Sequence, residues 1–308
     1  MVNMHYRKLL MSAAISLPML ALAATPSLPD RLRDPHGEAL VVSHRACWKF
    51  ASENTLDGIA ACIARGVDMV EIDVRTTRDG ALVLMHDETV DRTTDGHGAV
   101  ADLDAAQIAA LHVRSQGGGS ASTLTERHPP TLTQALALAH GHVLVNLDVK
   151  AASLDQIMDE VEAAGAQRDV LLNVPLDVPE AVLQRAHKAD IAVQALYSQR
   201  DSALSPQQAL RHAAALRPAV VQLMFDDPAV LGIAQRELAQ HARLFVNTMT
   251  SDIASGRPMR LSAHYTDQGA LRDPASVWGA LRNYGVSMIQ TDEVLALQHY
   301  LHATDTTR

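Results

Sequence analysis

The chain has 308 residues, of which 47% are hydrophobic and 20% charged, so it can bury a sizeable core and is not a disordered chain. It carries 26 Lys and Arg against 35 Asp and Glu, for a formal net charge of -9, and only 3% of its residues are aromatic. An acidic chain with few side chains for base stacking is not a nonspecific nucleic-acid binder.

The N-terminal segment has the pattern of a cleaved secretory signal. Arg7 and Lys8 precede an apolar run that ends at the small-x-small sequence Ala21-Leu22-Ala23. The alternative, a membrane anchor, is disfavoured because the run is short and polar residues interrupt it. We therefore expect residues 1–23 to be removed and residues 24–308 to form a single domain. That domain is expected to be exported, preferably to the periplasm, without stable membrane insertion.

The chain has two cysteines, Cys47 and Cys62, which are too few for a disulfide scaffold. Export would allow a bridge between them to persist, because disulfides survive in oxidising compartments. Two buried free thiols are an equally good interpretation. The spacing does not match the Cys-x-x-Cys pattern of a metal site.

Apolar segments rich in branched residues alternate with helical-period segments along the rest of the chain, which predicts an α/β protein with a parallel sheet. The expected strands are 39–43, 69–74, 143–149, 170–174, 191–196, 220–224, 244–247 and 286–290. The expected helices include 56–65, 154–164, 180–188, 206–216, 230–241 and 275–284. Eight such units in about 260 residues fit a closed TIM-type (β/α)8 barrel better than an open doubly wound sheet.

One part of the pattern is irregular, between the second and third expected strands. An additional strand-like piece occurs at 81–85, and a Gly-, Ser- and Thr-rich stretch follows at 115–123. This stretch lacks the lysine and the following helix of a phosphate-binding loop, so it is expected to be a surface loop. We predict a small insertion at the barrel mouth, spanning about residues 87–129.

Acidic residues alternate with apolar ones on the second expected strand. Side chains alternate between faces along a strand, so Glu71 and Asp73 share one face with Arg75. Two carboxylates on one buried face repel each other, and a hard divalent cation relieves that repulsion. The alternative is an internal salt-bridge network with Arg75.

The third expected strand repeats this arrangement with Asn146, Asp148 and Lys150 on one face. Asp148 can supply a third oxygen ligand, and Lys150 can hold an anionic group beside the metal. A purely structural Asp148 to Lys150 pair is the alternative.

Two histidines follow expected strands at the end of a barrel that carries chemistry. His44 and Arg45 follow the first strand, and His86 follows the additional strand. A cation site beside an arginine, a lysine and two imidazoles is typical of phosphodiester chemistry.

These residues resemble the glycerophosphodiester phosphodiesterase family. The motifs that carry the resemblance, in chain order, are His44-Arg45, Glu53-Asn54-Thr55, residues 66–74, Thr77-Arg78-Asp79-Gly80, His86-Asp87, residues 91–96, Pro130-Thr131-Leu132, residues 146–150 and residues 285–292. The match is dense over roughly residues 39–150 and thinner afterwards. The resemblance implies a TIM-type barrel that hydrolyses glycerophosphodiesters to sn-glycerol 3-phosphate and an alcohol.

The resemblance also implies roles for individual residues. Glu71, Asp73 and Asp148 match the metal ligands, with Ca²⁺ or Mg²⁺ expected. His44 and His86 match the acid/base pair, and Arg45 and Lys150 match the residues that bind the substrate phosphate. Glu53 and Asn247 are candidates for supporting roles.

The sequence departs from the family pattern at two of these motifs. Ala46 stands where glycine usually follows His-Arg, and its methyl group is tolerated unless the backbone there needs a positive φ. Asp148 stands where glutamate is more common, which shortens the reach of the carboxylate by one methylene.

Two rival functions remain open at this point. One is a lysophospholipase D or sphingomyelinase-like phosphodiesterase on the same barrel, and the other is a barrel that binds without catalysis. A small-molecule substrate is expected in each case, and the oligomeric state is left open.

Overall fold

The computed structural model describes residues 26–305, so the expected signal segment, residues 1–23, lies outside the described residues. Within residues 26–305, the chain forms a nine-stranded sheet in the order β1-β9-β8-β7-β6-β5-β4-β2-β3, and an additional β1–β2 pairing closes it. The barrel strands are β1 Leu40–Ser43, β2 Met69–Thr76, β4 Leu144–Ala151, β5 Val170–Pro175, β6 Ala192–Ser198, β7 Val220–Met224, β8 Arg243–Asn247 and β9 Val286–Thr291.

The predicted TIM-type barrel is therefore confirmed. All neighbouring strands of the ring pair in parallel. Strand β3, Leu82–Leu84, pairs antiparallel with β2 outside the ring, at the place where the additional strand is expected.

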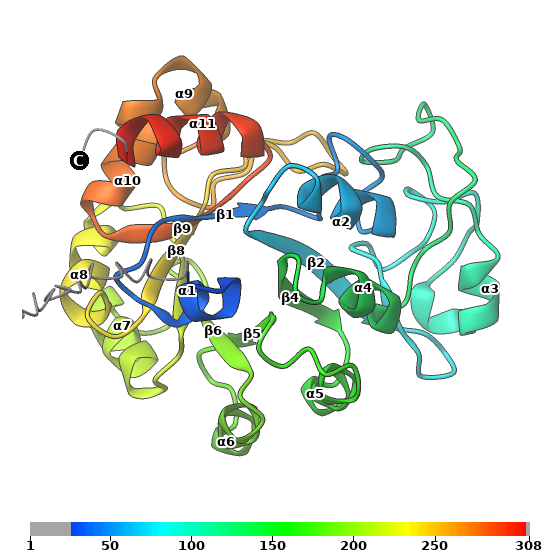
Figure 1. Ribbon diagram of the computed structural model, residues 1–308, viewed down its shortest axis with the longest axis horizontal. Helices are drawn as coiled ribbons and strands as arrows, with labels where there is room; N and C mark the ends of the chain where they lie inside the picture. The colour runs from blue at the N-terminus through cyan, green and yellow to red at the C-terminus, as the bar shows by residue number, and fades with distance from the viewer. Residues whose placement is uncertain (1–25, 306–308) are drawn as a thin grey trace, which may run out of the picture.

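Helices surround the barrel, as Figure 1 shows. They are α2 Leu56–Ile63, α4 Leu132–Ala139, α5 Leu154–Ala163, α6 Glu180–Lys188, α7 Pro206–Ala215, α8 Ala229–Leu238, α9 Asp267–Arg272, α10 Ala280–Asn283 and α11 Val294–Asp305. The expected caps form, because Thr55 and Ser153 accept hydrogen bonds from the first turns of α2 and α5. The helix expected over 275–284 is divided into a π-helical turn, Ala275–Gly279, and α10.

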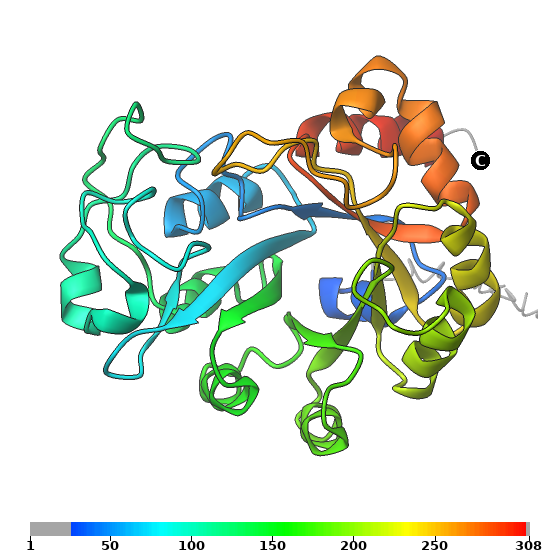
Figure 2. The same ribbon diagram turned by 180° about the vertical axis from the view of Figure 1, so that it is seen from behind.

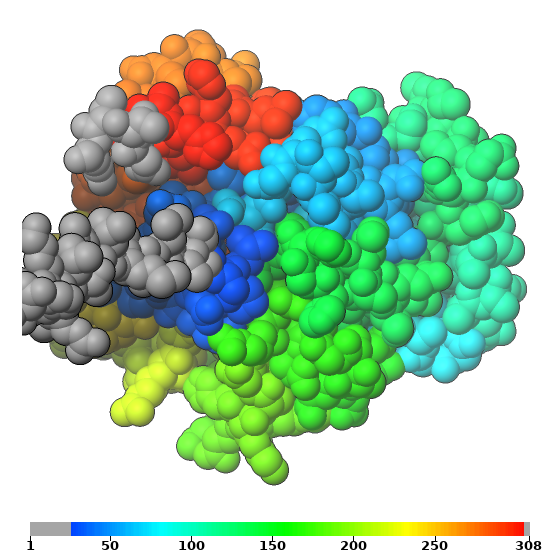
Figure 3. All heavy atoms as spheres, in the orientation of Figure 1, coloured from blue at the N-terminus to red at the C-terminus, as the bar shows by residue number. Residues whose placement is uncertain are grey.

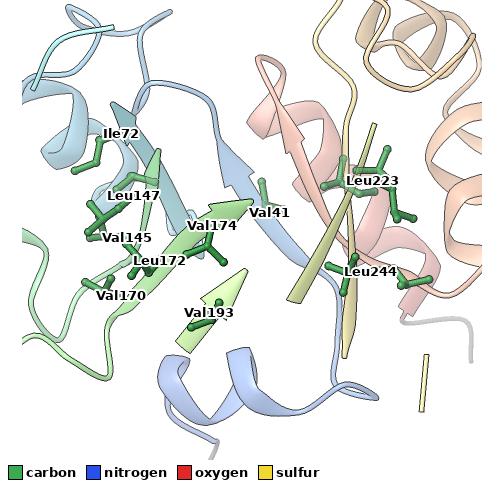
Figure 4. Close-up of a cluster of buried hydrophobic side chains, with 14 of the residues drawn as sticks. Val41, Ile72, Val145, Leu147, Val170, Leu172, Val174, Val193, Leu223 and Leu244 are labelled. Carbon is green, nitrogen blue, oxygen red and sulfur yellow. The ribbon is translucent and has the colours of Figure 1, made fainter. Parts of the chain in front are cut away.

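The main core lies between the barrel and its helices. Alternate residues of each strand, such as Ile72, Leu147, Leu172 and Leu223, point outward into this layer (Figure 4). The opposite face of each strand points into the barrel, so the alternation determines which side chains reach its interior.

One end of the barrel is sealed by α1, Leu28–Arg33. Leu32 of this helix packs on inward residues of the strands, including Leu40, Met69 and Phe245. The helix lies in front of the barrel in Figure 1 and behind it in Figure 2, and its dark blue atoms lie near the middle of the face in Figure 3. The loops that follow the strands are left to line the other end.

The insertion lies to one side of the barrel, beyond β2 (Figure 2). It contains a 3-10 turn, Val100–Asp102, and a short helix, α3, Ala105–Ala109. A small core of its own, built on Val90, Val100 and Ile108, packs against Val83 of β3. Within residues 26–305, no helix is both long enough and apolar enough to cross a membrane.

Candidate active site

The candidate residues meet in one cavity of about 350 Å³ at the end of the barrel opposite α1. Eight expected site residues line it: His44, Arg45, Glu71, Asp73, His86, Asp148, Lys150 and Asn247. They meet because β2 pairs in parallel with both β1 and β4, and because β3 folds back along β2.

Three carboxylates form a cluster on the inner wall. The strand register places Asp73 opposite Asp148, and Glu71 precedes Asp73 on the same face. One oxygen from each of these three side chains lies within 4.8 Å of the others. Glu71 and Asp73 are buried, and Asp148 is partly buried.

The two buried carboxylates are held by neutral donors. Glu71 accepts from the backbone N–H of Arg45 at 2.8 Å and from Nε2 of Gln290 at 3.2 Å. Asp73 accepts from Nδ2 of Asn54 at 2.7 Å, and its own N–H donates to Oδ1 of Asn54 at 3.0 Å. These contacts fix the directions of the carboxylates before any cation binds.

The electrostatics of the cluster favour a bound cation. Burial, together with the neighbouring charges of Asp73 and Asp148, raises the pKa of Glu71 well above its ordinary value. Burial would also raise the pKa of Asp73, but Lys150, His86 and Arg45 outweigh it and lower that pKa to about 2. Three convergent carboxylates are the donor set that hard cations such as Ca²⁺ and Mg²⁺ prefer. The residues present therefore fit a divalent metal.

Lys150 and Arg45 lie beside the acidic cluster, and Lys150 pairs with it directly. Nζ of Lys150 lies 2.7 Å from Oδ2 of Asp148 and 3.2 Å from Oδ1 of Asp73. Burial would lower the pKa of Lys150, but Asp73, Asp148 and Glu71 raise it above its ordinary value, so the ammonium form persists. The ion pair between Asp148 and Lys150, which the sequence offered as an alternative, is therefore present, and both residues line the cavity.

Arg45 reaches the cavity from an unusual backbone. Arg45 and Ala46 have φ values of 46° and 58°, in the left-handed region. The N–H of Arg45 donates to the carboxylate of Glu71, and the N–H of Ala46 donates to the backbone oxygen of Glu71 at 2.8 Å. Ala46 therefore stands at a position with a positive φ, which is the case in which alanine is less suited than glycine.

Glu53 supports the site through arginines. Its carboxylate lies 3.2 Å from Nη1 of Arg45 and accepts two hydrogen bonds from Arg92, at 2.7 and 2.8 Å. Among the described residues, Arg75 forms no ion pair with Glu71 or Asp73, so the expected alternative of a salt-bridge network is not formed. Arg75 donates instead to the backbone oxygen of His86, at 2.8 and 3.1 Å.

Each imidazole is backed by a carboxylate. Nδ1 of His44 lies 3.0 Å from Oδ1 of Asp292, which also accepts from Nε1 of Trp48 at 2.6 Å. Nδ1 of His86 lies 2.8 Å from Oδ1 of Asp87. Because a carboxylate only accepts hydrogen bonds, each Nδ1 carries a proton and each Nε2 is left for the cavity.

Both carboxylates that hold the imidazoles, those of Asp87 and Asp292, have a lowered pKa. Burial would raise the pKa of Asp87, but hydrogen bonds from Arg92 and His86 lower it. Burial would likewise raise the pKa of Asp292, and the contact with His44 lowers it. Both therefore remain anionic and orient their imidazoles.

A row of amides crosses the inner wall beneath the charged groups. Asn146 donates to Gln194, Gln194 donates to Gln222, and Gln222 donates to Oδ1 of Asn247, at 3.0, 2.7 and 2.9 Å. Asn247, a candidate for support, lines the cavity at the end of this row. No role was expected for Gln194, Gln222, Asn54, Arg92 or Asp292. Three of them, Asn54, Arg92 and Asp292, lie within motifs that carry the family resemblance, and that position is the signal that could have identified them.

Comparisons with known proteins identify the family of this chain. The family model described as the glycerophosphoryl diester phosphodiesterase family matches residues 44–215, and a model for a domain of unknown function matches residues 198–301. A glycerophosphodiester phosphodiesterase of Caldanaerobacter subterraneus is 36% identical over 37% of this chain and 46% of its own length. Human glycerophosphodiester phosphodiesterase 1 is 38% identical over 38% of this chain and 35% of its own length. The chain thus spans half or less of the length of these relatives.

Solved structures show the same fold over a longer range. A glycerophosphoryl diester phosphodiesterase from Parabacteroides distasonis superposes with a TM-score of 0.66 at 18% identity, over 91% of this chain and 93% of its own. A phosphodiesterase from Oleispira antarctica, solved in complex with the product sn-glycerol-3-phosphate, gives a TM-score of 0.56 at 22% identity, over 84% and 95%. The family model covers more than half of the chain, so this protein belongs to the glycerophosphoryl diester phosphodiesterase family.

Proposed function

We propose that this chain hydrolyses glycerophosphodiesters to sn-glycerol 3-phosphate and an alcohol. The observation that carries the proposal is the pair of carboxylate-backed imidazoles, His44 and His86, lining one cavity with an acidic cluster and the side chains of Arg45 and Lys150. The product bound to the Oleispira antarctica relative and the names of the curated relatives support the same substrate class.

Glu71, Asp73 and Asp148 would hold a divalent cation, Ca²⁺ or Mg²⁺. Such a cation, when bound, supplies Lewis-acid stabilisation of charge on phosphate oxygens. Arg45 and Lys150 bind the same phosphate group, and Glu53 holds the guanidinium of Arg45 in position.

His44 and His86 move the protons. One imidazole removes the proton of the nucleophile at its Nε2, and the other donates a proton from its Nε2 to the leaving alkoxide. The nucleophile is either water or the glycerol hydroxyl of the substrate, and attack by the hydroxyl passes through a cyclic phosphate. Detection of a cyclic species by ³¹P NMR during turnover distinguishes the two routes.

The direct test is release of sn-glycerol 3-phosphate from glycerophosphocholine by the purified protein with Ca²⁺, with Mg²⁺ and with excess chelator. Release that depends on a metal supports the proposal. Full activity in chelator would contradict the metal requirement. Release of choline from lysophosphatidylcholine, without turnover of glycerophosphocholine, would favour the lysophospholipase D alternative.

Variants of the imidazoles test their role in catalysis. His44→Ala and His86→Ala should each lose at least about a hundredfold in kcat, because general acid or base catalysis contributes about 10²- to 10⁴-fold. His97→Ala, which removes an exposed imidazole from the insertion, is the matched control and should keep its activity. Substrate binding without turnover in the unaltered protein would favour the binding barrel.

We also propose that residues 1–23 are a cleaved signal and that residues 24–308, with their insertion, form one exported periplasmic domain. The disulfide between Cys47 and Cys62 supports export, because such bonds persist in oxidising compartments. N-terminal sequencing of the protein from a periplasmic extract tests the cleavage site.

A further inference from the structure

A second cavity, of about 540 Å³, adjoins the catalytic one. Its walls come from the loops after β1, β8 and β9 and from the Gly-rich stretch of the insertion. Asp252, in the loop after β8, lines both cavities. A substrate whose phosphate lies in the catalytic cavity could therefore extend one of its two organic halves into this second space.

The walls of the second cavity carry a negative charge. Four carboxyl groups, those of Asp252, Asp267, Asp292 and Glu293, line it, and Lys49 is the one cation among the lining residues. From the side of the catalytic cavity, Arg45 lies 3.9 Å from Asp252. Lys49 forms an ion pair with Glu293, so it neutralises part of that charge from within the wall.

An aromatic ring stands in the same wall. Trp48 lines the cavity and is held by its hydrogen bond to Asp292, and Nζ of Lys49 lies 5.8 Å from the centroid of its ring. An ammonium group at this distance from an indole is attracted by the quadrupole of the ring. Nζ of Lys49 thus lies near both the indole of Trp48 and the carboxylate of Glu293. An indole beside a carboxylate is a pair of groups that binds alkylammonium ions.

The two cavities differ in what they offer a ligand. The amides on the wall of the catalytic cavity, ending at Asn247, suit the hydroxyl groups of a glycerol moiety. The second cavity offers carboxylates and an indole instead. We propose that it binds the alcohol half of the substrate and selects alcohols that carry an ammonium group, such as choline or ethanolamine. This inference rests on the proposed function.

The test compares two substrates of the same shape. Glycerophosphocholine and its carbon isostere, the 3,3-dimethylbutyl ester of glycerol 3-phosphate, differ only in a trimethylammonium against a tert-butyl group. We expect kcat/KM to favour the choline ester by at least about fivefold, in the range of a partly desolvated contact between a cation and an aromatic ring.

Variants of the wall should move this ratio in opposite directions. Glu293→Gln removes a carboxylate and should lower the preference for choline. Lys49→Gln removes the competing cation and should raise it. Glu237→Gln, an acidic side chain on α8 paired with Arg211, is the matched control and should leave the ratio unchanged.

The outcomes separate this inference from the function on which it rests. Hydrolysis of both esters with a ratio near one in the unaltered protein would overturn the inference and leave the proposed function intact. Unchanged ratios in both wall variants would also overturn it. Hydrolysis of neither ester would overturn the proposed function and the inference together.

Discussion

Ala46 occupies a position that suits glycine better than alanine. Its φ of 58° is in the left-handed region, where an L-residue with a Cβ is less stable by about 1–2 kcal/mol. The conformation directs the N–H groups of Arg45 and Ala46 toward Glu71, so the strained backbone positions both a metal-ligand candidate and the candidate phosphate-binding side chain of Arg45. Ala46 is also fully buried, and its methyl group lies close to Gly58 of α2.

Two substitutions at Ala46 should separate strain from packing. Ala46→Gly should change the free energy of unfolding by less than about 1 kcal/mol, because relief of the left-handed strain is offset by a lost buried methyl and a more flexible unfolded chain. Ala46→Val should lower it by about 3 kcal/mol or more, since a branched side chain is strained there and overfills the space beside Gly58. Urea unfolding measures both. A valine variant as stable as the unaltered protein would contradict this interpretation.

Asp292 should act as a positioning residue for His44. Asp292→Asn keeps the size of the side chain but removes the charge that holds the Nδ1 proton of His44. With the 3,3-dimethylbutyl ester of glycerol 3-phosphate, which carries no ammonium group, we expect kcat to fall at least about tenfold with little change in KM, because the imidazole loses its tautomer and the stabilisation of its cation. Asp226→Asn, at an exposed carboxylate paired with Arg200, is the control. A rise confined to KM would show that Asp292 acts on substrate binding instead.

At the scale of elements, the disulfide joins the loop after β1 to helix α2. Cys47 follows Arg45 and Ala46, and Cys62 lies in the last turn of α2, 15 residues further on. Glu53 and Asn54, which hold Arg45 and Asp73, lie within the closed loop. The bond therefore ties together the segment that positions two site residues, Arg45 and Asp73.

Reduction of this disulfide should lower the free energy of unfolding by about 3 kcal/mol, the value expected for a loop of this length. Urea unfolding with and without dithiothreitol measures the change. The double variant Cys47→Ala, Cys62→Ala should be less stable to a similar degree and should not respond to the reductant. Equal stability of the oxidised and reduced protein would contradict the prediction.

The strands were more predictable than the short helices. Each barrel strand begins and ends within two residues of its expected bounds, because strands buried on both faces form apolar runs that the sequence displays directly. Helix α4 was missed although Thr131 and Gln134 form a capping box, a signal that the sequence contains. Helix α1 was also missed, although Ser27 caps it and a proline stands in its first turn. Its burial was harder to infer, since Leu32 packs mostly on strands far along the chain.

The site was predictable to the extent that it lies on strands. Alternation along β2 and β4 places Glu71, Asp73 and Asp148 on one face, and parallel pairing then brings them together. Asp292 approaches His44 only because β9 closes the barrel against β1 in the register that pairs Ser43 with Thr291. The eight strand–helix units in the sequence allow closure of the barrel to be inferred, but they do not give the register between β1 and β9.

At the scale of the whole molecule, stability should be linked to the metal. The three carboxylates come from β2 and β4, strands with extensive mutual pairing at the mouth of the barrel. A ligand that binds only the folded state stabilises it by about 2.7 kcal/mol at a hundredfold excess over Kd. Addition of Ca²⁺ or Mg²⁺ to chelator-treated protein should therefore raise Tm by several degrees, whether or not substrate is present.

The size of that rise should depend on pH. The pKa of Glu71 is raised by burial and by Asp73 and Asp148, so the folded protein without metal holds a proton that the unfolded chain releases. This contribution to stability is full below the ordinary carboxyl pKa and is lost as the pH rises through the raised value. Since a cation must displace the same proton, the rise in Tm should grow as the pH increases from the ordinary carboxyl range through the raised pKa of Glu71. Glu71→Gln removes the titrating group and a ligand, so its Tm should show neither the metal response nor this part of the pH dependence. An equal metal-induced rise in the variant and the unaltered protein, measured by differential scanning calorimetry, would place the cation elsewhere.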